Sequence, residues 1–271
     1  MSARCDIRAL SVGTRFYNCC HGRGFARVLS VHARVINVVC KDELLALALP
    51  QVGGSSRFLC LSALPDLVCG DIVQLTPQAL IMETATIDLT EVSIWKGPLP
   101  VEIRATLTAA NYALFEEAVR TLALKPGVDA ACSLSPATVS RWMGLGPGLT
   151  PAGDDVLLGY LAVDNLFGRD KARTKALHKA VESALGQTTT LSAHILRSAL
   201  CSDYHEYIQC VLAVISGLSN EHILTALRRL RAVGATSGES TIYGMLLAMQ
   251  DIMLLDGVQE SVEKQEVGVR S

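Results

Sequence analysis

The sequence RWMGLGPGLTPAGDDVLLGYLAV, residues 141–163, joins a glycine-rich loop to an apolar helix. Its glycines permit tight turns and expose N–H groups, while Thr150 suits a helix N-cap and Pro151 the first helical position. The unpaired N–H groups and positive dipole end of such a helix favour a phosphate or carboxylate. No Walker lysine follows the loop, and the glycine spacing differs from the dinucleotide fingerprint, so ATP and NAD receive no support.

Asp154 and Asp155 fall in the first turn of this predicted helix. One explanation is structural, because acidic residues there gain about 0.3 to 1 kcal/mol from the helix dipole. The other is functional: Asp154 shares a face with Leu157 and Leu161, so we expect its carboxylate to point inward and to need backbone donors, a basic group, Mg²⁺ or a substrate nitrogen. We therefore predict that both aspartates are catalytic. The anion-binding residues predicted around them are Gly146, Gly148, Thr150 and Gly153.

A second segment, residues 234–244, repeats the pattern of the first with one residue deleted. In each segment a glycine begins the helix and another follows six residues later, where a neighbouring backbone can approach closely. The repeat predicts that the two helices pack together and that their starts converge on one site. Thr236 and Glu239 have the spacing of a capping box, which is a complete structural explanation. The functional alternative is that Thr236, Ser237 and Gly238 bind the ligand.

Between these segments lies GQTTTLSAHILRSAL, residues 186–200, a polar turn followed by a predicted helix. We predict that Ser192 and Arg197 bind the anion, since a guanidinium can clamp a carboxylate, although a surface arginine is more common. His194 is explained by a core position or by a role as a general base. The chain has no G-x-S-x-G or H-E-x-x-H motif, so standard hydrolases and zinc proteases have no support.

The hydrophobic pattern changes near residue 100. Short β-branched runs separated by Gly, Pro, Ser or Asp precede that point, and apolar residues at helical spacing follow it. Residues 41–49 fit either a short helix or a buried strand. We predict an α+β fold with a β-rich N-terminal domain (1–100) and a mainly α-helical C-terminal domain (101–271). The predicted helices are 105–124, 135–143, 151–166, 171–185, 191–200, 204–215, 221–232 and 238–255, followed by a frayed polar tail.

Composition limits the function further. With 24 basic and 26 acidic residues, the chain has no strong electrostatic field to attract nucleic acid. It contains no run of 18 apolar residues, so we predict no membrane span. The N-terminus lacks the features of a signal peptide, so we expect a cytoplasmic protein. The nine cysteines include no C-x-x-C pair, which favours reduced thiols. Cys19, Cys20 and His21 are adjacent, but zinc ligands normally come as separated pairs, and we predict no metal site there.

The string G-x-G-P-G-L-T-P-x-G-D-D-x-L-x-G-x-L at 144–161, with T-S-G at 236–238, resembles a bacterial domain family formerly of unknown function. Over the whole chain the resemblance is to the family's allantoin-catabolism member, a subunit of oxamate carbamoyltransferase. It implies that oxalurate and phosphate become oxamate and carbamoyl phosphate, in anaerobic purine breakdown, with larger partner subunits. Ser240 stands where the family often has Asp, and the S-x-R-T phosphate signature of better-known carbamoyltransferases is missing.

Two other functions stay open at this stage. The chain could be a non-catalytic assembly subunit of the same complex, its glycine-rich helices serving only to pack closely. It could instead be a hydrolase that uses the aspartates with Mg²⁺ and needs no partner. Mg²⁺ is the one cofactor that the aspartates suggest.

Overall fold

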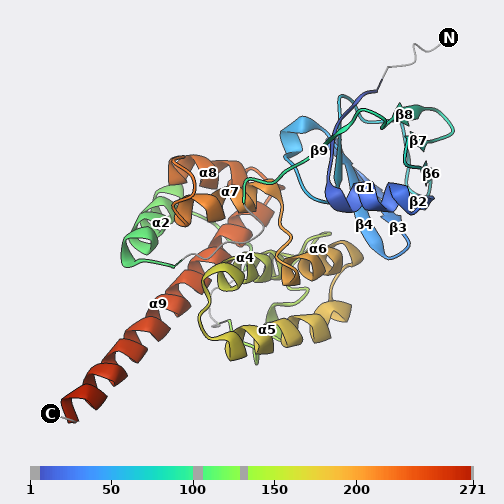
Figure 1. The fold of residues 1–271 in the computed structure, drawn as a ribbon. Coiled ribbons are helices and arrows are strands. Elements are labelled where there is room, and N and C mark those ends of the chain that lie inside the picture. The colour runs from blue at the N-terminus through green and yellow to red at the C-terminus, as the bar shows by residue number, and fades with distance from the viewer. Residues whose placement is uncertain (1–6, 100–105, 129–133, 270–271) are drawn as a thin grey trace. The chain divides into compact units, whose positions relative to one another are not determined.

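The computed structural model describes residues 7–99, 106–128 and 134–269, with the backbone alone described for 256–269. The chain forms two compact units. Residues 1–98 and 204–206 make the first, and residues 99–203 and 207–271 make the second. The first unit contains a nine-stranded sheet and the second contains the helices that follow it in the chain (Figure 1). The predicted α+β class, with a β-rich N-terminal half and a mainly helical C-terminal region, is confirmed.

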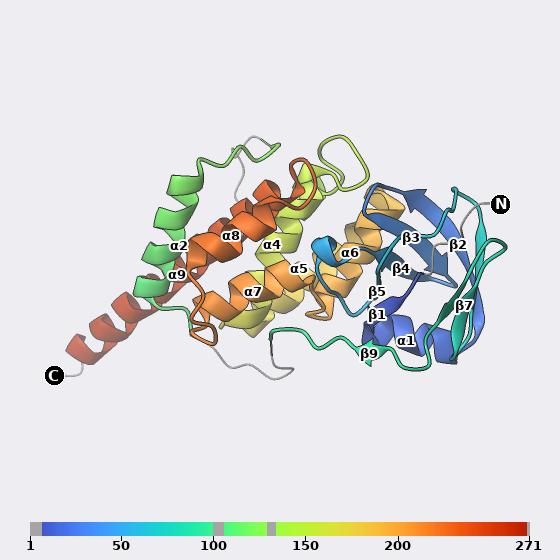
Figure 2. The ribbon, with the colours of Figure 1, turned by 90° about the horizontal axis from the view of Figure 1, so that it is seen from above.

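The first unit, here called the sheet unit, is a mixed sheet that curls around one apolar core (Figure 2). Its elements are β1 (Ala9–Val12), α1 (Thr14–His21), β2 (Gly24–Val31), β3 (Val35–Cys40), β4 (Glu43–Ala48), the 3₁₀ helix η1 (Pro50–Val52), β5 (Phe58–Leu61), β6 (Ile72–Leu75), β7 (Ala79–Ile81), β8 (Thr86–Asp88) and β9 (Ser93–Ile94). The strand order is β8-β7-β6-β2-β3-β4-β5-β1-β9, with parallel pairing at β4–β5 and β1–β9. The other neighbouring pairs are antiparallel.

The structure settles residues 41–49 as a strand. In β4, every residue from Leu44 to Ala48 is buried, so both faces of the strand are covered and its sequence lacks the polar alternation of a half-exposed strand. The sequence did not predict β1 or α1. Cys20 of α1 packs into the sheet core, and burial raises the pKa of its thiol to about 12. This thiol is a core group rather than a nucleophile.

The second unit, here called the helix unit, is all α apart from one short 3₁₀ turn among the residues described. Its elements are α2 (Ala109–Leu122), α3 (Val139–Trp142), α4 (Ala152–Phe167), α5 (Lys171–Ala184), η2 (Leu185–Gln187), α6 (Thr190–Leu200), α7 (Glu206–Ile215), α8 (Ile223–Arg231) and α9 (Ser237–Val269). Helix α9 continues to Val269, beyond the predicted helix end at residue 255. None of the described helices is both long and apolar enough to cross a membrane.

Helix α4 is central to the helix unit, with 13 of its 16 residues buried. It packs against α9 through two glycines, as the sequence repeat predicts. A Cβ at Gly159 would collide with the backbone carbonyl of Thr241, and a Cβ at Gly244 would collide with that of Val156. The contact is reciprocal, because each glycine meets the residue three positions before the other glycine. Glycine at both positions therefore sets how closely the two backbones approach.

The two helices run parallel. Ser237 at the start of α9 lies 2.9 Å from Thr150, which precedes the start of α4, measured between their hydroxyl oxygens. Farther along both helices, the Tyr160 hydroxyl donates to Asp251 at 2.6 Å. Parallel packing brings the two N-termini, each with a glycine-containing loop before it, to the same end of the pair.

Candidate functional site

The loop before α4 owes its shape to three glycines. Gly144, Gly146 and Gly148 have φ angles of +72°, +112° and +96°, a region that side-chain-bearing residues rarely adopt. A Cβ at Gly144 would also lie only 2.6 Å from the carbonyl oxygen of Gln187. Gly146 and Gly148 are exposed residues, and their N–H groups donate no hydrogen bond in the described part of the chain. Unpaired N–H groups in a glycine-rich loop can bind an anion.

Thr150 does not cap the helix, contrary to the prediction. Helix α4 begins at Ala152, its N-cap is Pro151, and no side chain caps it. Pro151 has the extended backbone conformation of an N-cap residue (φ −53°, ψ 141°), which moves the helix start by one residue. The Thr150 hydroxyl instead pairs with the Ser237 hydroxyl and links the starts of α4 and α9.

Asp154 connects the loop to the helix. Its side chain points inward, as predicted, and the residue is 1% exposed. One carboxylate oxygen accepts the Gly144 N–H at 2.7 Å, and the other accepts the Thr188 hydroxyl in a short hydrogen bond. Both oxygens therefore have protein donors, which supports the structural explanation for Asp154. No observation tests its catalytic role, which stays a prediction.

Asp155 is in a different position. The residue is 5% exposed, and its Oδ2 is buried and accepts no hydrogen bond from any residue that the structure describes. Burial raises the pKa of Asp155 to about 7; a hydrogen bond from the Ser237 hydroxyl opposes this change, and the charge of Asp154 adds to it. The Asp155 carboxyl thus combines a pKa raised toward neutrality with one buried oxygen that has no donor among the described residues.

The start of α9 contributes one side chain to this cluster. Ser237 contacts both Thr150 and Asp155, whereas Thr236 is exposed. Gly238 is buried because a Cβ there would collide with the end of α8. The predicted capping box is wrong. Glu239 accepts the Lys125 N–H at 2.7 Å and the Nε of Arg231 at 2.8 Å instead, so its carboxylate connects neighbouring segments rather than capping its own helix.

The polar turn before α6 also forms hydrogen bonds to the glycine loop and to Asp154. Besides the Thr188 bond to Asp154, the Thr189 hydroxyl donates to the Leu149 carbonyl oxygen and accepts the Ser192 N–H at 3.1 Å. Ser192 is 2% exposed. Arg197 is exposed on α6, and no hydrogen bond or ion pair joins it to the loop in the residues described. The sequence analysis missed Thr188 and Thr189, although the run of three threonines was the available signal.

Mg²⁺ does not fit these aspartates as an ion held by the protein alone. Both oxygens of Asp154 already accept hydrogen bonds, which leaves one oxygen of Asp155. Among the described residues, no group of three His, Cys, Asp or Glu side chains could hold a metal. The described residues therefore offer no all-protein Mg²⁺ site at these aspartates.

The loop, the threonine turn and the starts of α4 and α9 all lie within one segment that matches a known family. Residues 142–249, which are 108 of the 271 residues, match the family model described as oxamate carbamoyltransferase subunit AllH. This segment of the chain resembles AllH. The resemblance predicted from the glycine and aspartate motif is thereby confirmed. No solved structure matches the chain.

The AllH match covers the elements that build the site. It begins at Trp142, the last residue of α3, and ends at Met249 within α9. A Cβ at Gly153 would collide with the carbonyl of Trp142, so Gly153 allows α3 to pack against the start of α4. The resemblance of the sheet unit to the same family stays a prediction.

Proposed function

We propose that this chain is a subunit of an oxamate carbamoyltransferase complex that converts oxalurate and phosphate to oxamate and carbamoyl phosphate. Two lines of argument support the proposal. The AllH family is named for this enzyme, and both proposed substrates are small anions. A site made of helix N-termini and loop N–H groups suits such anions without requiring a large basic patch.

The observation that carries the proposal is the paired helix start. Helices α4 and α9 are parallel, and the hydroxyls of Thr150 and Ser237 join their N-termini at 2.9 Å. Two positive dipole ends therefore lie on one side of the pair, beside the N–H groups of Gly146 and Gly148. Asp155 accepts a hydrogen bond from Ser237, and its other oxygen lacks a donor among the described residues. Anion-binding groups and an acceptor for N–H groups thus occur together.

In the proposed reaction, a phosphate oxygen attacks the carbamoyl carbon of oxalurate and the bond from that carbon to the oxamate nitrogen breaks. The departing nitrogen takes up a proton to give oxamate. The N–H groups of the glycine loop hold the phosphate or the oxalurate carboxylate. Oδ2 of Asp155 accepts an N–H of the ureido group and orients the carbamoyl carbon toward phosphate. Ser237 fixes the Asp155 carboxyl through its hydrogen bond.

The remaining predicted residues take smaller parts in this proposal. Asp154 acts as a positioning residue, since it holds the loop through Gly144 and Thr188. Thr236 is exposed and remains a candidate substrate contact, while Gly153 and Gly238 allow close packing behind the site. Ser192 would act through Thr189, and we expect a smaller effect from Arg197.

The test is to assemble the complex with its partner subunits and measure carbamoyl phosphate formed from oxalurate and phosphate. The variants are Asp155→Asn and Asp154→Asn, with Glu182→Gln as a control because Glu182 is exposed on α5. We expect Asp155→Asn to lower kcat/KM by about 100-fold or more, within the range of a positioned catalytic group, in an intact complex. Glu182→Gln should keep full activity. Full activity of Asp155→Asn would overturn the assignment of Asp155.

A second candidate is a non-catalytic assembly subunit, favoured by the apolar side chains on the loop. Leu145 is 45% exposed and Leu149 is 48% exposed, a suitable surface for a partner subunit to cover. The discriminating measurement is calorimetric binding of phosphate and oxalurate to the chain alone and to the assembled complex. Binding that Asp155→Asn weakens supports the catalytic role. A complex that needs the chain but tolerates the variant in both binding and turnover supports the assembly role.

A further inference from the structure

The sheet unit has an open groove at one end of the β2–β6 ladder. The groove has a volume of about 490 Å³. Small-ligand sites usually measure roughly 300 to 1,000 Å³, so it has the size of such a site. Its lining includes Arg23, Phe25, Gln74 and Gln78. These residues come from β2 and the residue before it, and from β6 and the turn after it, so the whole groove belongs to the sheet unit.

Strand register places an aromatic ring beside an amide in this groove. Phe25 of β2 pairs with Gln74 of the antiparallel strand β6, so their side chains lie side by side on one face of the sheet. Phe25 is 65% exposed and Gln74 is also exposed, whereas the next residues of each strand toward the middle of the ladder, Ala26 and Val73, are buried in the core. Ile81 of β7 pairs with Gln74 on its other side and is 40% exposed. The groove therefore opens onto a partly apolar surface.

Arg23 has an unusual backbone conformation for an arginine. Its N–H donates to the Cys20 carbonyl oxygen at 3.1 Å just after the end of α1. Its φ angle is +45°, a left-handed value that glycine normally takes at this position after a helix. The exposed guanidinium forms no hydrogen bond or ion pair with any residue that the structure describes. No contact of the Arg23 side chain within the described chain therefore explains an arginine in a conformation that favours glycine.

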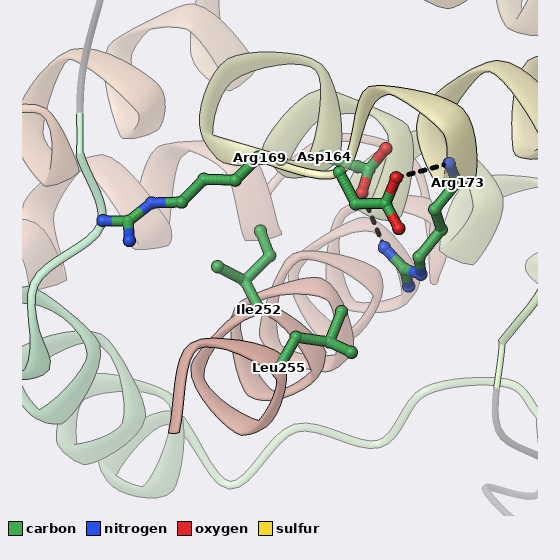
Figure 3. A pocket seen from close by; sticks show the side chains of 7 residues that line it. Asp164, Arg169, Arg173, Ile252 and Leu255 are labelled. Carbon is green, nitrogen blue, oxygen red and sulfur yellow. Dashed lines mark hydrogen bonds and ion pairs between the residues drawn. The ribbon is translucent and has the colours of Figure 1, made fainter. Parts of the chain in front are cut away.

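The charged groups of the pocket at the end of α4 are paired instead. That pocket has a volume of about 50 Å³, which fits only a few water molecules. Figure 3 shows Asp164 and Arg173 together at one side of it, and their side chains form an ion pair at 2.9 Å. A ligand there would have to compete with this ion pair. In the groove of the sheet unit, a ligand meets an arginine that has no competing partner among the described residues.

Charge and shape define the class of ligand. Arg23 is the one charged residue among the described residues that line the groove, so a single negative charge matches it and a dianion would keep an unbalanced charge. A guanidinium binds a carboxylate through two parallel N–H bonds. The exposed Phe25 ring offers a face to a planar group. The side-chain amides of Gln74 and Gln78 have no partner in the described part of the chain and can donate or accept at its edge.

We propose that this groove binds a small planar monocarboxylate, with the carboxylate on Arg23 and the planar group against Phe25. The site is built from the sheet unit alone and uses no residue of the glycine loop. The proposal therefore stands whether or not the chain takes part in carbamoyl transfer.

The test is an NMR titration of the full chain with benzoate at neutral pH, following the backbone amides of residues 23–27 and 72–76. Benzamide has the shape of benzoate without its charge, acetate has the carboxylate without the ring, and phenyl phosphate has the ring with a more highly charged group. We expect saturable shifts of these amides with benzoate and binding of benzamide and acetate that is weaker by about tenfold or more. No saturable shift with benzoate, equal binding of benzamide or acetate, or tighter binding of phenyl phosphate would each overturn the proposal.

Matched variants tie the binding to this groove. Arg34 is also exposed, but it lies in the turn between β2 and β3, outside the lining. We expect Arg23→Gln to weaken benzoate binding by about tenfold or more and Arg34→Gln to leave it unchanged. Phe25→Thr keeps a residue that favours strands but removes the ring, and it should weaken binding by about threefold or more. Unchanged binding in Arg23→Gln or in Phe25→Thr would contradict the assigned contacts.

Arg23→Gly separates binding from folding. Glycine adopts a φ angle of +45° without strain, so the Tm of this variant should not fall below that of the wild type. Benzoate binding should weaken as much as in Arg23→Gln. A clear fall in Tm would show that the Arg23 side chain supports the fold, and it would overturn the assignment of Arg23 to a ligand.

Discussion

The two units bury different kinds of side chain. The core of the sheet unit is aliphatic, with Val12, Leu45 and Leu59 fully buried around it. The helix unit buries three carboxylates, Asp154, Asp155 and Asp164, and among the described residues these are the only buried carboxylates. All three lie on α4. The buried carboxylates are thus concentrated on one helix, while the sheet unit is built mainly by apolar packing.

A buried carboxylate must find donors close by, because water no longer reaches it. Asp154 has two donors within the protein, whereas Asp155 and Asp164 each keep an oxygen without one. Burial raises the pKa of Asp155 in the helix unit, but it lowers the pKa of His205 in the sheet unit and so keeps that side chain neutral. The stabilities of the two units should therefore respond in opposite directions to pH.

The chain provides a fluorescence reporter for each unit, since Trp95 belongs to the sheet unit and Trp142 to the helix unit.

The largest effect should come from adding one methyl group between α4 and α9. Gly159→Ala would drive its Cβ into the Thr241 carbonyl, and we expect a loss of about 3 kcal/mol or more in the free energy of unfolding of the helix unit. The measurement is urea unfolding followed by Trp142 fluorescence in a Trp95→Phe background. Gly186→Ala is the control, because nothing lies within 4 Å of its added Cβ. Equal losses in the two variants would contradict the close-packing argument.

The next effect concerns Asp155 and pH. Its pKa is about 7 in the folded chain against a reference value of 3.8, so the folded state binds the proton more tightly. Protonation of Asp155 stabilises the folded state. This stabilisation is fully present below the reference pKa of 3.8 and is lost as pH rises through 7, and it amounts to about 4 kcal/mol at most. Asp155→Asn should therefore stabilise the helix unit by about 2 kcal/mol at pH 8 and have little effect at pH 4. Trp142-monitored urea unfolding at both pH values checks this.

Asp154→Asn provides the contrast on the same helix turn. We expect it to destabilise the helix unit, because an amide cannot accept from both Gly144 and Thr188 as the carboxylate does. Stabilisation by both asparagine variants at pH 8 would show that the two aspartates do not differ as the geometry indicates.

A smaller loss should follow from removing one donor to Asp154. Thr188→Val keeps the shape of the side chain but deletes the hydroxyl, and we expect a loss of about 2 kcal/mol because the hydrogen bond is to a buried charge. Thr190→Val is the control, since Thr190 is exposed and its side chain makes no hydrogen bond to any described residue. Thermal unfolding of both variants and of the wild type measures this loss. A Thr188→Val protein as stable as Thr190→Val would contradict a stabilising role for the hydrogen bond from Thr188 to Asp154.

The smallest effect is the acid response of the sheet unit. Burial lowers the pKa of His205 to about 4; a hydrogen bond to the Val52 backbone opposes this and the charge of Arg57 adds to it. The stabilisation that neutral His205 gives the sheet unit is fully present above its reference pKa of 6.5 and is lost as pH falls through 4. Because the side chain is partly accessible, we expect a loss of about 1 kcal/mol between pH 7 and 4.5. Trp95 fluorescence during urea unfolding measures it, and His205→Gln should abolish the dependence.

Much of the fold could be predicted from local pattern. The change from β-branched runs to helical spacing near residue 100 marks the start of the helical half, and the glycine repeat predicts that α4 and α9 pack together. Strand β4 was ambiguous because burial on both faces removes the alternation that identifies a strand. Helix α1 was missed because TRFYNCCH has no acidic first turn and no side-chain cap to mark its start.

The site could be predicted only in outline. The glycine loop, the inward Asp154 and the convergence with Ser237 followed from spacing within each segment. The roles of Thr150 and Glu239 were wrong because their partners come from distant segments: Ser237 is 87 positions from Thr150, and Lys125 is 114 positions from Glu239. A capping motif fixes the residue types that a local bond needs, but a tertiary partner at hydrogen-bond distance can replace that bond.

The reciprocal glycines at the α4–α9 crossing also limit how this site can evolve. A larger residue at Gly159 or Gly244 would collide with the backbone of the other helix, so the distance between the two helix starts is fixed. Under the proposed function, a fit to a longer or shorter substrate would therefore require changes in the loop before α4, for example at the exposed Leu145 or Leu149, while the distance between the helix starts stays the same.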